Sequence, residues 1–491
     1  MTLAIILVYL GLVLLVGLAS HRLFRGTGED YFLATRSIGP FVLLMSLFGT
    51  HMTAFSLLGA SAEGYRSGIG VFGLMASSSA LVVPVVFYFV GTRMWAEGKR
   101  HGFVTQVQYF RARWDSNGVG LLLFAVLVAL LIPYLLIGVM GAGIAVAQIT
   151  GGQVAEWIGG LAVCAVVMAY VTYGGLRGTA WVNTFQTLVF MTLGAVTFFW
   201  IVREMGGLDA AMARVAGEHP DLMIRGDRVA PLKMLTYACI PLSVGMFPHI
   251  FMHWLTARSQ DSFRLPLVGY PLCVAIVWLP SVLLGILGRS AIPGLEGPAA
   301  SSVLVQLIQQ HAPALVAGLL GAGVFAAIMS SLDSQVLSLG TMFTQDVVRH
   351  HGFHDRMSEK QQVLAGRLFV AVILLVTYLI SLVASRRIFS FGIWSFTGYA
   401  ALFPVVLAAL FWRRSTKQGV LAAVASVAVL WVYFFYRGWS SPGYTVGGTG
   451  VMPVAVMLVV SAAVLAAVSL ATAPPGREVL QRFFDASGPE R

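Results

Sequence analysis

The chain has 491 residues, of which 58% are hydrophobic and only 10% charged, and its formal net charge is +11. Because soluble domains carry about 25% charged residues, the composition excludes a soluble protein and predicts an all-α polytopic membrane protein. The positive charge does not indicate a nucleic-acid partner, since most lysines and arginines lie between apolar segments. The partners we expect are the lipid bilayer and a small-molecule solute.

Segments long enough to cross a bilayer follow one another along the whole chain. A spanning helix needs about 20 mainly apolar residues, and this criterion predicts thirteen spans. They cover residues 2–20, 38–62, 69–92, 118–149, 153–173, 179–203, 232–254, 265–288, 313–348, 362–384, 388–412, 417–436 and 452–472. The chain, 1–491, is therefore expected to form a single integral membrane domain.

The basic residues predict how the chain is oriented. With thirteen spans the termini lie on opposite sides of the membrane, and 21 of the 31 lysines and arginines fall on the side of the first connection. Short basic loops stay in the cytoplasm. We therefore expect a plasma or inner membrane protein with its N-terminus outside and its C-terminus in the cytoplasm.

Two predicted spans are interrupted rather than continuous. The second carries glycine, hydroxyl groups and a histidine at mid-depth, in residues 46–53, and the seventh carries two prolines and two histidines in residues 241–253. In many transporters, broken helices at matching positions of two inverted repeats form the central binding site. We interpret 38–203 and 232–412 as two such repeats, with two ordinary proline or glycine kinks as the alternative.

The ninth predicted span carries a single acidic residue at depth, because Asp333 is the only charged residue between His311 and Asp346. A carboxylate there is costly and marks a functional site by default. Four small residues share one helix face at spacings of three and four, namely Ala327, Ser330, Ser331 and Ser334. Their oxygens suit a hard cation such as sodium, whereas close packing of small residues against another helix is the alternative.

Four segments spread over almost the whole chain carry a family pattern. They are Tyr31-Phe32-Leu33-Ala34 with Arg36-Ser37-Ile38-Gly39, Tyr173-Gly174-Gly175-Leu176-Arg177-Gly178 with Trp181 and Gln186, Phe247-Pro248-His249, and Ala327 to Ser334 with Thr344-Gln345-Asp346. Together they resemble the sodium:solute symporter family, which includes the proline, pantothenate, sugar and sialic acid symporters.

The resemblance implies a five-plus-five inverted-repeat fold, shared with the bacterial leucine transporter. An extra N-terminal helix, 2–20, would precede the repeats, and two C-terminal helices, 417–472, would follow them. The resemblance also implies solute import coupled to inward flow of Na+ by alternating access. The common sodium site would use the matching residues of this chain, which are the carbonyls of Gly49, Met52 and Ala327 and the hydroxyls of Ser330 and Ser331.

Some relatives have a second sodium site, with an aspartate on the fifth repeat helix and hydroxyls on the eighth. The matching residues here are Asn183 and Asp333, so the carboxylate stands on the opposite helix. We expect a cation site formed by Asp333, Ser334 and Asn183, with Ser330 as a further ligand. Two alternatives stay open for Asp333, a protonated carboxyl in a dry interior and a proton relay.

Polar groups in and around the breaks are expected to contact the solute. They are His51, Thr53, Ser56, His249, His253 and Trp394. The proline symporter branch has an aspartate where this chain has His51, so the resemblance fails there. That histidine is expected to contact solute or respond to protons, or else to bond the backbone of the broken helix. The small, mostly uncharged set favours a monocarboxylate or amino acid, with a sugar, vitamin or nucleoside as alternatives.

Other function classes lack their motifs in this sequence. The chain has no P-loop and no HExxH zinc motif, so we predict neither an ATP-driven pump nor an enzyme. Na+ is the expected coupling ion, and a proton-coupled symporter of the same fold is the first alternative. The second is a membrane solute sensor that works with a separate partner.

Overall fold

The computed structural model describes residues 2–20, 36–226, 229–350, 357–385, 387–439, 441 and 443–485. The segments with regular structure in these ranges are helical, and the one isolated β-bridge joins Ile38 and Ala257. This confirms the all-α prediction for the described part of the chain. The first family segment, residues 31–34, lies outside the described residues.

The helices fall into two sets along the chain. The first set is α1 (Thr2–Ser20), α3 (Pro40–His51), η3 (Phe55–Gly59), α4 (Ala60–Ser67), α5 (Gly70–Phe72), η4 (Gly73–Ser77), α6 (Ser78–Val86), η5 (Phe87–Gly91), α7 (Thr92–His101), α8 (Gln106–Arg113), α9 (Asn117–Ile149), α10 (Glu156–Glu204), α11 (Leu208–Glu218) and η6 (Pro220–Leu222). The second set is α12 (Pro231–Tyr237), η8 (Ile240–Gly245), α13 (Pro248–Leu255), η9 (Gln260–Phe263), α14 (Arg264–Ala291), η10 (Gly297–Ser302), α15 (Val303–His311), α16 (Ala314–Met342), η11 (Phe343–Arg349), α17 (Glu359–Val383), α18 (Ile388–Ala401), α19 (Phe403–Phe411), α20 (Lys417–Gly438), η13 (Val446–Gly448), α21 (Pro453–Ala471), α22 (Arg477–Leu480) and η14 (Gln481–Asp485).

Within the described residues, nine helices are long and apolar enough to cross a membrane, or eleven if each of two bent pairs is one span. Two shorter apolar helices, Ala4–Val16 and Glu156–Ala169, lie where the first and fifth spans are predicted. The fold is thus a multi-helix membrane fold, while the number thirteen stays a prediction.

The boundary between the fifth and sixth predicted spans is a correction. The sequence predicts separate spans at 153–173 and 179–203, whereas the structure assigns one helix, α10, from Glu156 to Glu204. The glycines around residues 174–178 do not end it. A glycine inside a helix costs only about 1 kcal/mol relative to alanine, which tertiary packing readily offsets.

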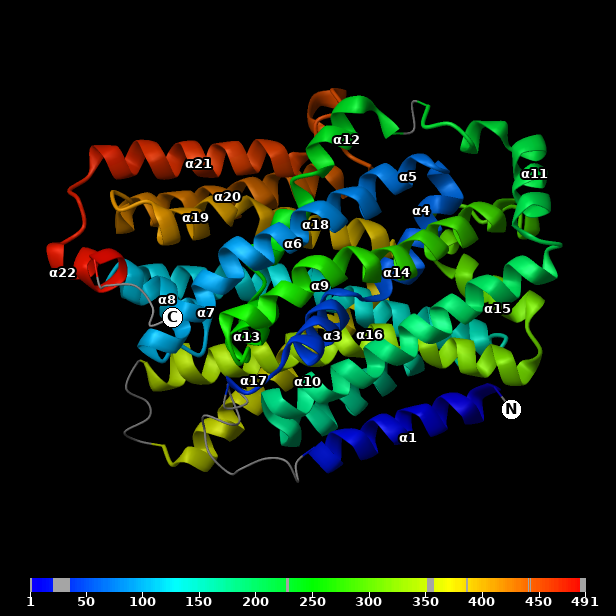
Figure 1. Cartoon of the computed structure of the whole chain (residues 1–491), viewed down its shortest axis with the longest axis horizontal. Helices are drawn as coiled ribbons and strands as arrows, with labels where there is room; N and C mark the ends of the chain where they lie inside the picture. The colour runs from blue at the N-terminus through cyan, green and yellow to red at the C-terminus, as the bar shows by residue number, and fades with distance from the viewer. Residues whose placement is uncertain are drawn as a thin grey trace.

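Figure 1 shows the long helices lying side by side along the longest dimension, with the two termini toward opposite ends. Helix α16 occupies the middle and packs against α10, α9, α3 and α1. In its most apolar stretch 83% of the residues are buried, against 22% for α17 at the periphery. The polar residues of α16 are therefore enclosed by protein rather than exposed to lipid.

The two predicted helix breaks are confirmed. The chain bends by 63° between α3 and the helical segment Phe55–Ser67, and by 52° between the segment Pro231–Gly245 and α13. The ends of these broken helices touch, since the Ile38 N–H donates to the Thr256 carbonyl at 3.0 Å and the Arg258 N–H donates to the Ile38 carbonyl at 2.9 Å. Two segments far apart in sequence are thereby fixed against each other beside α16.

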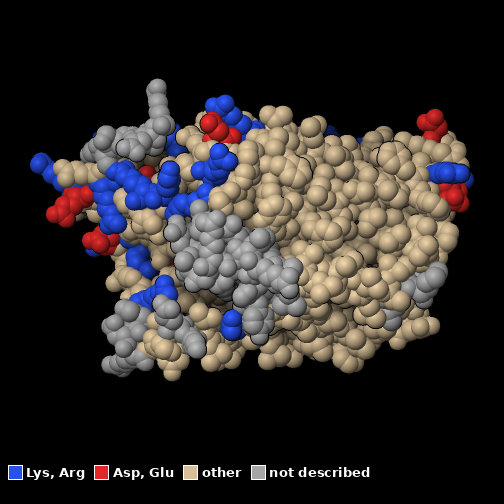
Figure 2. Space-filling model, turned by 60° about the horizontal axis from the view of Figure 1, so that its bottom comes forward, with Lys and Arg blue, Asp and Glu red and all other residues tan. Residues whose placement is uncertain are grey.

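The surface divides into a basic end and an uncharged belt. In Figure 2 the lysines and arginines gather at the left end, while a broad band without charged side chains covers much of the rest of this face. That end corresponds to the region of α7, α8 and α22 in Figure 1. A wide apolar belt with charge confined to the ends is the surface that a bilayer-embedded protein requires.

Candidate functional site

The first broken helix meets α16 at the residues predicted to form the common sodium site. The Ser330 hydroxyl lies 2.9 Å from the Gly49 carbonyl oxygen and 3.1 Å from the Ala327 carbonyl oxygen. Three predicted oxygens thus converge within hydrogen-bonding distance of one another. Ser330 and Ala327 are fully buried, so this cluster of oxygens lies in a dry interior.

Gly49 allows this approach because it lies directly against α10. A Cβ atom at that position would lie 2.0 Å from the Thr187 hydroxyl oxygen and 3.3 Å from the Asn183 carbonyl oxygen. The Thr187 hydroxyl donates to the Met45 carbonyl at 3.0 Å, which ties α3 to α10 one turn earlier. Only a residue without a side chain fits between α3 and α10 here.

Met52 lies at the end of α3, where the helix stops. Its backbone is extended (φ −78°, ψ 133°) and its N–H still donates to the Phe48 carbonyl at 2.9 Å. Carbonyls freed by a break are the groups that bind ions in broken-helix transporters. The other predicted ligand, Ser331, donates its hydroxyl to the Ile328 carbonyl of its own helix at 3.2 Å.

The second predicted site is a chain of hydrogen bonds that crosses from α10 to α16. The Asn183 side-chain N–H donates to the Ser334 hydroxyl at 2.7 Å, and that hydroxyl donates to Asp333 Oδ1 at 3.3 Å. His253 of α13 reaches the same hydroxyl through Nε2 at 3.1 Å. Because the single Ser334 hydrogen goes to the carboxylate, both nitrogen atoms must donate to its oxygen.

One oxygen at this site is left over. Asn183 Oδ1 is buried and has no hydrogen-bond partner within the described part of the chain. A buried polar atom without a partner costs about 1–3 kcal/mol, and a bound cation would satisfy it. The donor set of one carboxylate, one amide oxygen and nearby hydroxyls fits a hard cation, which prefers oxygen ligands.

The three histidines of the predicted substrate set lie close together, at the two breaks. His51 contacts the Tyr270 hydroxyl through Nδ1, and its ring lies 6.0 Å from that of Phe247. The His249 ring stacks on Phe247 at 5.1 Å, and neither of its ring nitrogens has a hydrogen-bond partner among the described residues. His249 therefore offers one donor and one acceptor, both buried and unused.

The remaining residues of that set behave differently. Thr53 and Ser56 bond within the broken helix, since the Thr53 N–H donates to the Ser56 hydroxyl at 3.1 Å and the Phe55 N–H donates to the Thr53 hydroxyl at 3.4 Å. Trp394 lies apart and lines a separate cavity of about 340 Å³, which none of the predicted histidines, nor Thr53 or Ser56, lines. The structure therefore brings His51, His249 and His253 together but not Trp394.

Sequence reasoning did not include two tyrosines that complete the surroundings of His51. Tyr270 contacts its ring, and the Tyr134 hydroxyl donates to its carbonyl at 3.4 Å. Both hydroxyls come from apolar helices, α14 and α9, where a single tyrosine gives no pattern. The only available signal was a polar tip inside an apolar span, where buried tyrosine hydroxyls usually find a partner.

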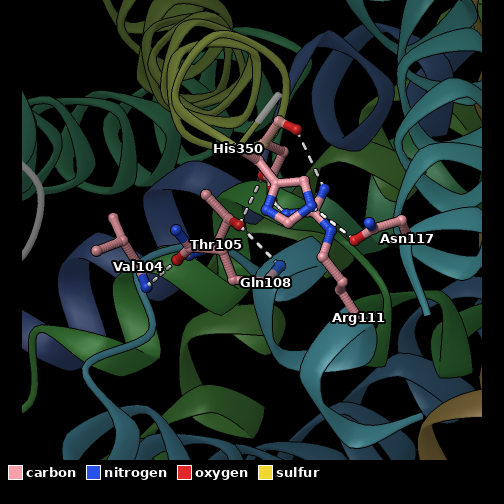
Figure 3. Close-up of polar contacts among 7 residues, drawn as sticks. Val104, Thr105, Gln108, Arg111, Asn117 and His350 are labelled. Atoms are coloured by element: carbon pink, nitrogen blue, oxygen red, sulfur yellow. Dashed lines mark hydrogen bonds and ion pairs between the residues drawn. The ribbon is translucent and has the colours of Figure 1, made fainter. Parts of the chain in front are cut away.

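A second buried carboxylate lies at the basic end of the molecule, where α16 continues as η11. Asp346 accepts from the Thr105 hydroxyl at 2.7 Å and pairs with Arg111 at 3.4 Å, while Arg111 also donates to the Asp346 carbonyl at 3.1 Å. Figure 3 shows Thr105, Gln108 and Arg111 converging beside the contact of Asn117 with His350. These contacts join α8 to the end of α16.

Helix α8 is built to present these groups. Thr105 is its N-cap and accepts from the Gln108 N–H at 3.1 Å, while the Gln108 side chain accepts from the Thr105 N–H at 3.2 Å. This capping box fixes the Thr105 hydroxyl, whose own hydrogen is then free for Asp346. Burial lowers the pKa of Arg111, and the Asp346 carboxylate opposes that shift.

Comparison with known proteins gives the family. The family model described as "Sodium:solute symporter family" matches residues 31–426, which is most of the chain. The chain belongs to the sodium:solute symporter family. A family member of this kind is a transporter and not an enzyme, its coupling ion is Na+, and its other substrate is a small-molecule solute.

Curated relatives of this symporter cover most of its length. The sodium/proline symporter of Escherichia coli (strain K12) is 26% identical over 472 residues, covering 91% of each chain. The sodium/pantothenate symporter of the same organism is 27% identical over 427 residues, covering 83% of this chain and 85% of the relative. These relatives and the many apolar helices make this symporter a multi-pass plasma membrane protein.

Solved structures agree on the fold of the symporter. A Na+-coupled sialic acid symporter in a substrate-bound, outward-open state superposes with a TM-score of 0.78 at 18% identity, covering 97% of this chain and 98% of that one. Mhp1, a nucleobase-cation-symport-1 family transporter, gives a TM-score of 0.60 at 14% identity, covering 94% and 97%. At these identities the likeness establishes the transporter fold.

Proposed function

We propose that this protein imports a small organic solute together with Na+ by alternating access. The helices would form two inverted repeats, 38–203 and 232–412, with an extra N-terminal helix at 2–20 and two C-terminal helices at 417–472. The N-terminus would lie outside and the C-terminus in the cytoplasm. The gathering of basic residues at the end that carries the C-terminus supports this orientation, because positive segments stay inside.

The observation that carries the proposal is the contact between the first broken helix and α16. The Ser330 hydroxyl lies within 3.1 Å of the Gly49 and Ala327 carbonyl oxygens. Met52 and Ser331 would complete a five-oxygen set around one Na+. A cation held between two segments stabilises the conformation in which they touch, and it can shift the equilibrium only by its differential affinity for the two states.

Asp333, Ser334 and Asn183 would form a second cation site. The free Asn183 Oδ1 and the connected Ser334 hydroxyl support it, since both oxygens lie at the contact between α10 and α16. A proton carried by Asp333 would serve the same coupling role and is the competing proposal, because intramembrane acids also act as proton relays.

The solute would bind around His51, His249 and His253. The unpartnered ring nitrogens of His249 support this assignment, because a ligand that accepts and donates one hydrogen bond would satisfy both. The rings of Phe247 and Tyr134 pack against His249 at 5.1 and 5.5 Å and would give the apolar walls. Pockets for small molecules combine such walls with a few placed polar groups.

Thr105, Arg111 and Asp346 would hold the cytoplasmic side shut. They join α8 to the same helix that carries Ser330 and Asp333, and a cavity of about 520 Å³ lies beside them, lined in part by Gln108, Arg111 and His350. Opening toward the cytoplasm would then require these contacts to separate.

The test is transport into proteoliposomes that hold the purified protein. Solutes are first screened by thermal unfolding with and without Na+ at fixed ionic strength, because a ligand that binds only the folded state raises its stability. Radiolabelled uptake of each hit is then driven by an inward Na+ gradient, or by a proton gradient without Na+. Accumulation with Na+ alone supports the proposal.

Other outcomes separate the alternatives. Accumulation driven by the proton gradient without Na+ would replace the sodium proposal with proton coupling through Asp333. Saturable binding without accumulation under either gradient would instead identify a membrane solute sensor that requires a separate partner.

A further inference from the structure

A second cavity, distinct from the residues assigned to Na+ and solute, opens near the far ends of α4, α18 and α20. It has a volume of about 340 Å³, within the range of about 300–1,000 Å³ that small-molecule sites occupy. One wall is aromatic and includes Phe391, Trp394 and Tyr444. The cavity therefore has the size and apolar surface that the body of a small organic ligand requires.

Charged side chains line the same cavity and leave an excess of positive charge. The one acidic lining residue, Glu63, accepts from the Ser67 hydroxyl at 2.9 Å and pairs with Arg66 at 3.4 Å. Arg66 also donates to the Gly297 carbonyl at 2.8 Å. Two further cations, Lys233 and Arg387, line the cavity, and neither has an ion pair among the described residues.

We propose that this outer cavity binds a small organic carboxylate with an apolar body, which waits there before it enters the central site. Arg387 and Lys233 would hold the carboxylate, since a guanidinium matches two carboxylate oxygens. Trp394 and Phe391 would contact the apolar body. The carboxylate as transported solute rests on the proposed function, whereas the binding site itself does not.

A continuous row of rings links the cavity to the proposed solute site. Phe389 lines the cavity and stacks on Phe55 at 5.0 Å, and Phe55 meets Phe396 edge to face at 5.1 Å. Phe396 in turn contacts Phe247 at 5.7 Å, the ring on which His249 stacks. The cavity is thus separated from the histidines by a few aromatic side chains, which must move for a ligand to pass.

Phe55 has the position of a barrier in this row. It belongs to the π-helical segment just after the break in the first broken helix, so a change in the bend would move its ring. Its contact partner Gly392 has no side chain, and a Cβ there would lie 2.4 Å from the Phe55 ring. The geometry thus connects release of a ligand from the outer cavity to motion of the segment that carries Gly49 and Met52.

The test measures binding to the purified protein with matched probe pairs. Propionate, cyclohexanecarboxylate and 3-phenylpropionate are each compared with their neutral amides by thermal unfolding and equilibrium dialysis, in Na+ and in choline. We expect at least one carboxylate to bind more tightly than its amide in either cation. The Arg387→Gln and Lys233→Gln variants should each weaken that binding about tenfold, and Arg387→Lys should weaken it less.

Arg437→Gln is the matched control, because Arg437 ends α20 near the cavity, is exposed, and does not line it. The proposal is overturned if no carboxylate is preferred over its amide, or if Arg437→Gln weakens binding as much as Arg387→Gln. It is also overturned if binding requires Na+ and is abolished by Ser330→Ala, since the probe then occupies the central site. Failure of Na+-driven uptake with Na+-independent binding intact would refute the transport proposal alone.

Discussion

Two buried carboxylates lie on the same long helical element, and their surroundings are opposite. Asp333 is reached by the uncharged groups of Ser334 and, through it, of Asn183 and His253. Asp346, on the continuation of α16 into η11, receives the guanidinium of Arg111 and the hydroxyl of Thr105. One carboxylate is placed among oxygens that suit a cation, and the other already has a cation from the protein.

The difference separates a site that exchanges its ligand from one that holds two elements together. A carboxylate paired with an arginine is satisfied in one conformation and is strongly destabilising when the pair is broken. A carboxylate beside hydroxyls and a free amide oxygen instead has its full effect only when a mobile cation arrives. Substitutions at the two positions should therefore change different measurements.

The largest effect is expected from Asp346→Ala. It leaves Arg111, whose side chain is only 10% exposed, without its carboxylate, and breaking a buried pair in this way costs about 3–5 kcal/mol. The midpoint of thermal unfolding of the purified protein should fall markedly. The double change Asp346→Leu with Arg111→Leu should recover much of the loss, because no buried charge remains.

Asp333→Asn tests the other side of the comparison. The asparagine still accepts from Ser334, so the thermal midpoint without Na+ should change little. The sodium concentration for half-maximal solute uptake should rise on the order of tenfold, which corresponds to about 1.4 kcal/mol. Returning the acid to the other helix, by Asn183→Asp with Asp333→Ser, should restore part of the sodium dependence. Unchanged sodium coupling in Asp333→Asn would remove this residue from the cation sites.

The sequence predicted the environment of Asp333 better than that of Asp346, for a physical reason. A lone charge in an apolar span is conspicuous because lipid and protein interiors both penalise it. The partner of Asp346 lies 235 residues away on a short amphipathic connection, and no local periodicity relates the two. The contact of His51 with Tyr270, 219 residues apart, escaped for the same reason.

Element prediction followed the same division between local and distant information. The breaks near Met52 and Pro248 were predicted because proline, glycine and clustered hydroxyls act on the neighbouring backbone. The continuity of α10 through residues 174–178 was missed, since packing against α16 and α9 outweighs the weak helix preference of glycine there.

Thr105→Val should have a smaller effect than loss of the Asp346 carboxylate. It removes the N-cap of α8, worth about 1 kcal/mol, together with the hydroxyl that donates to Asp346. We expect a modest fall in the thermal midpoint and faster labelling of a cysteine introduced at Gln345, beside the inner cavity. Thr105→Ser keeps the hydroxyl and should behave like the unaltered protein. A sodium half-saturation that rises in Thr105→Val would blur the distinction between the two carboxylates.

The smallest effect is expected from Ser330→Ala, with Ser338→Ala as its control. Both serines are fully buried on α16, but the Ser338 hydroxyl donates to the Gln335 carbonyl at 2.7 Å, within its own helix. Ser330 instead joins α16 to the Gly49 carbonyl of the broken helix. Each change removes one hydrogen bond worth about 0.5–1.5 kcal/mol, so their effects on stability should be similar. Only Ser330→Ala should raise the sodium concentration needed for uptake, by roughly two- to tenfold on the same scale. Equal sodium dependence in the two variants would mean that Ser330 is a packing residue, as the small-residue helix contact alone would predict.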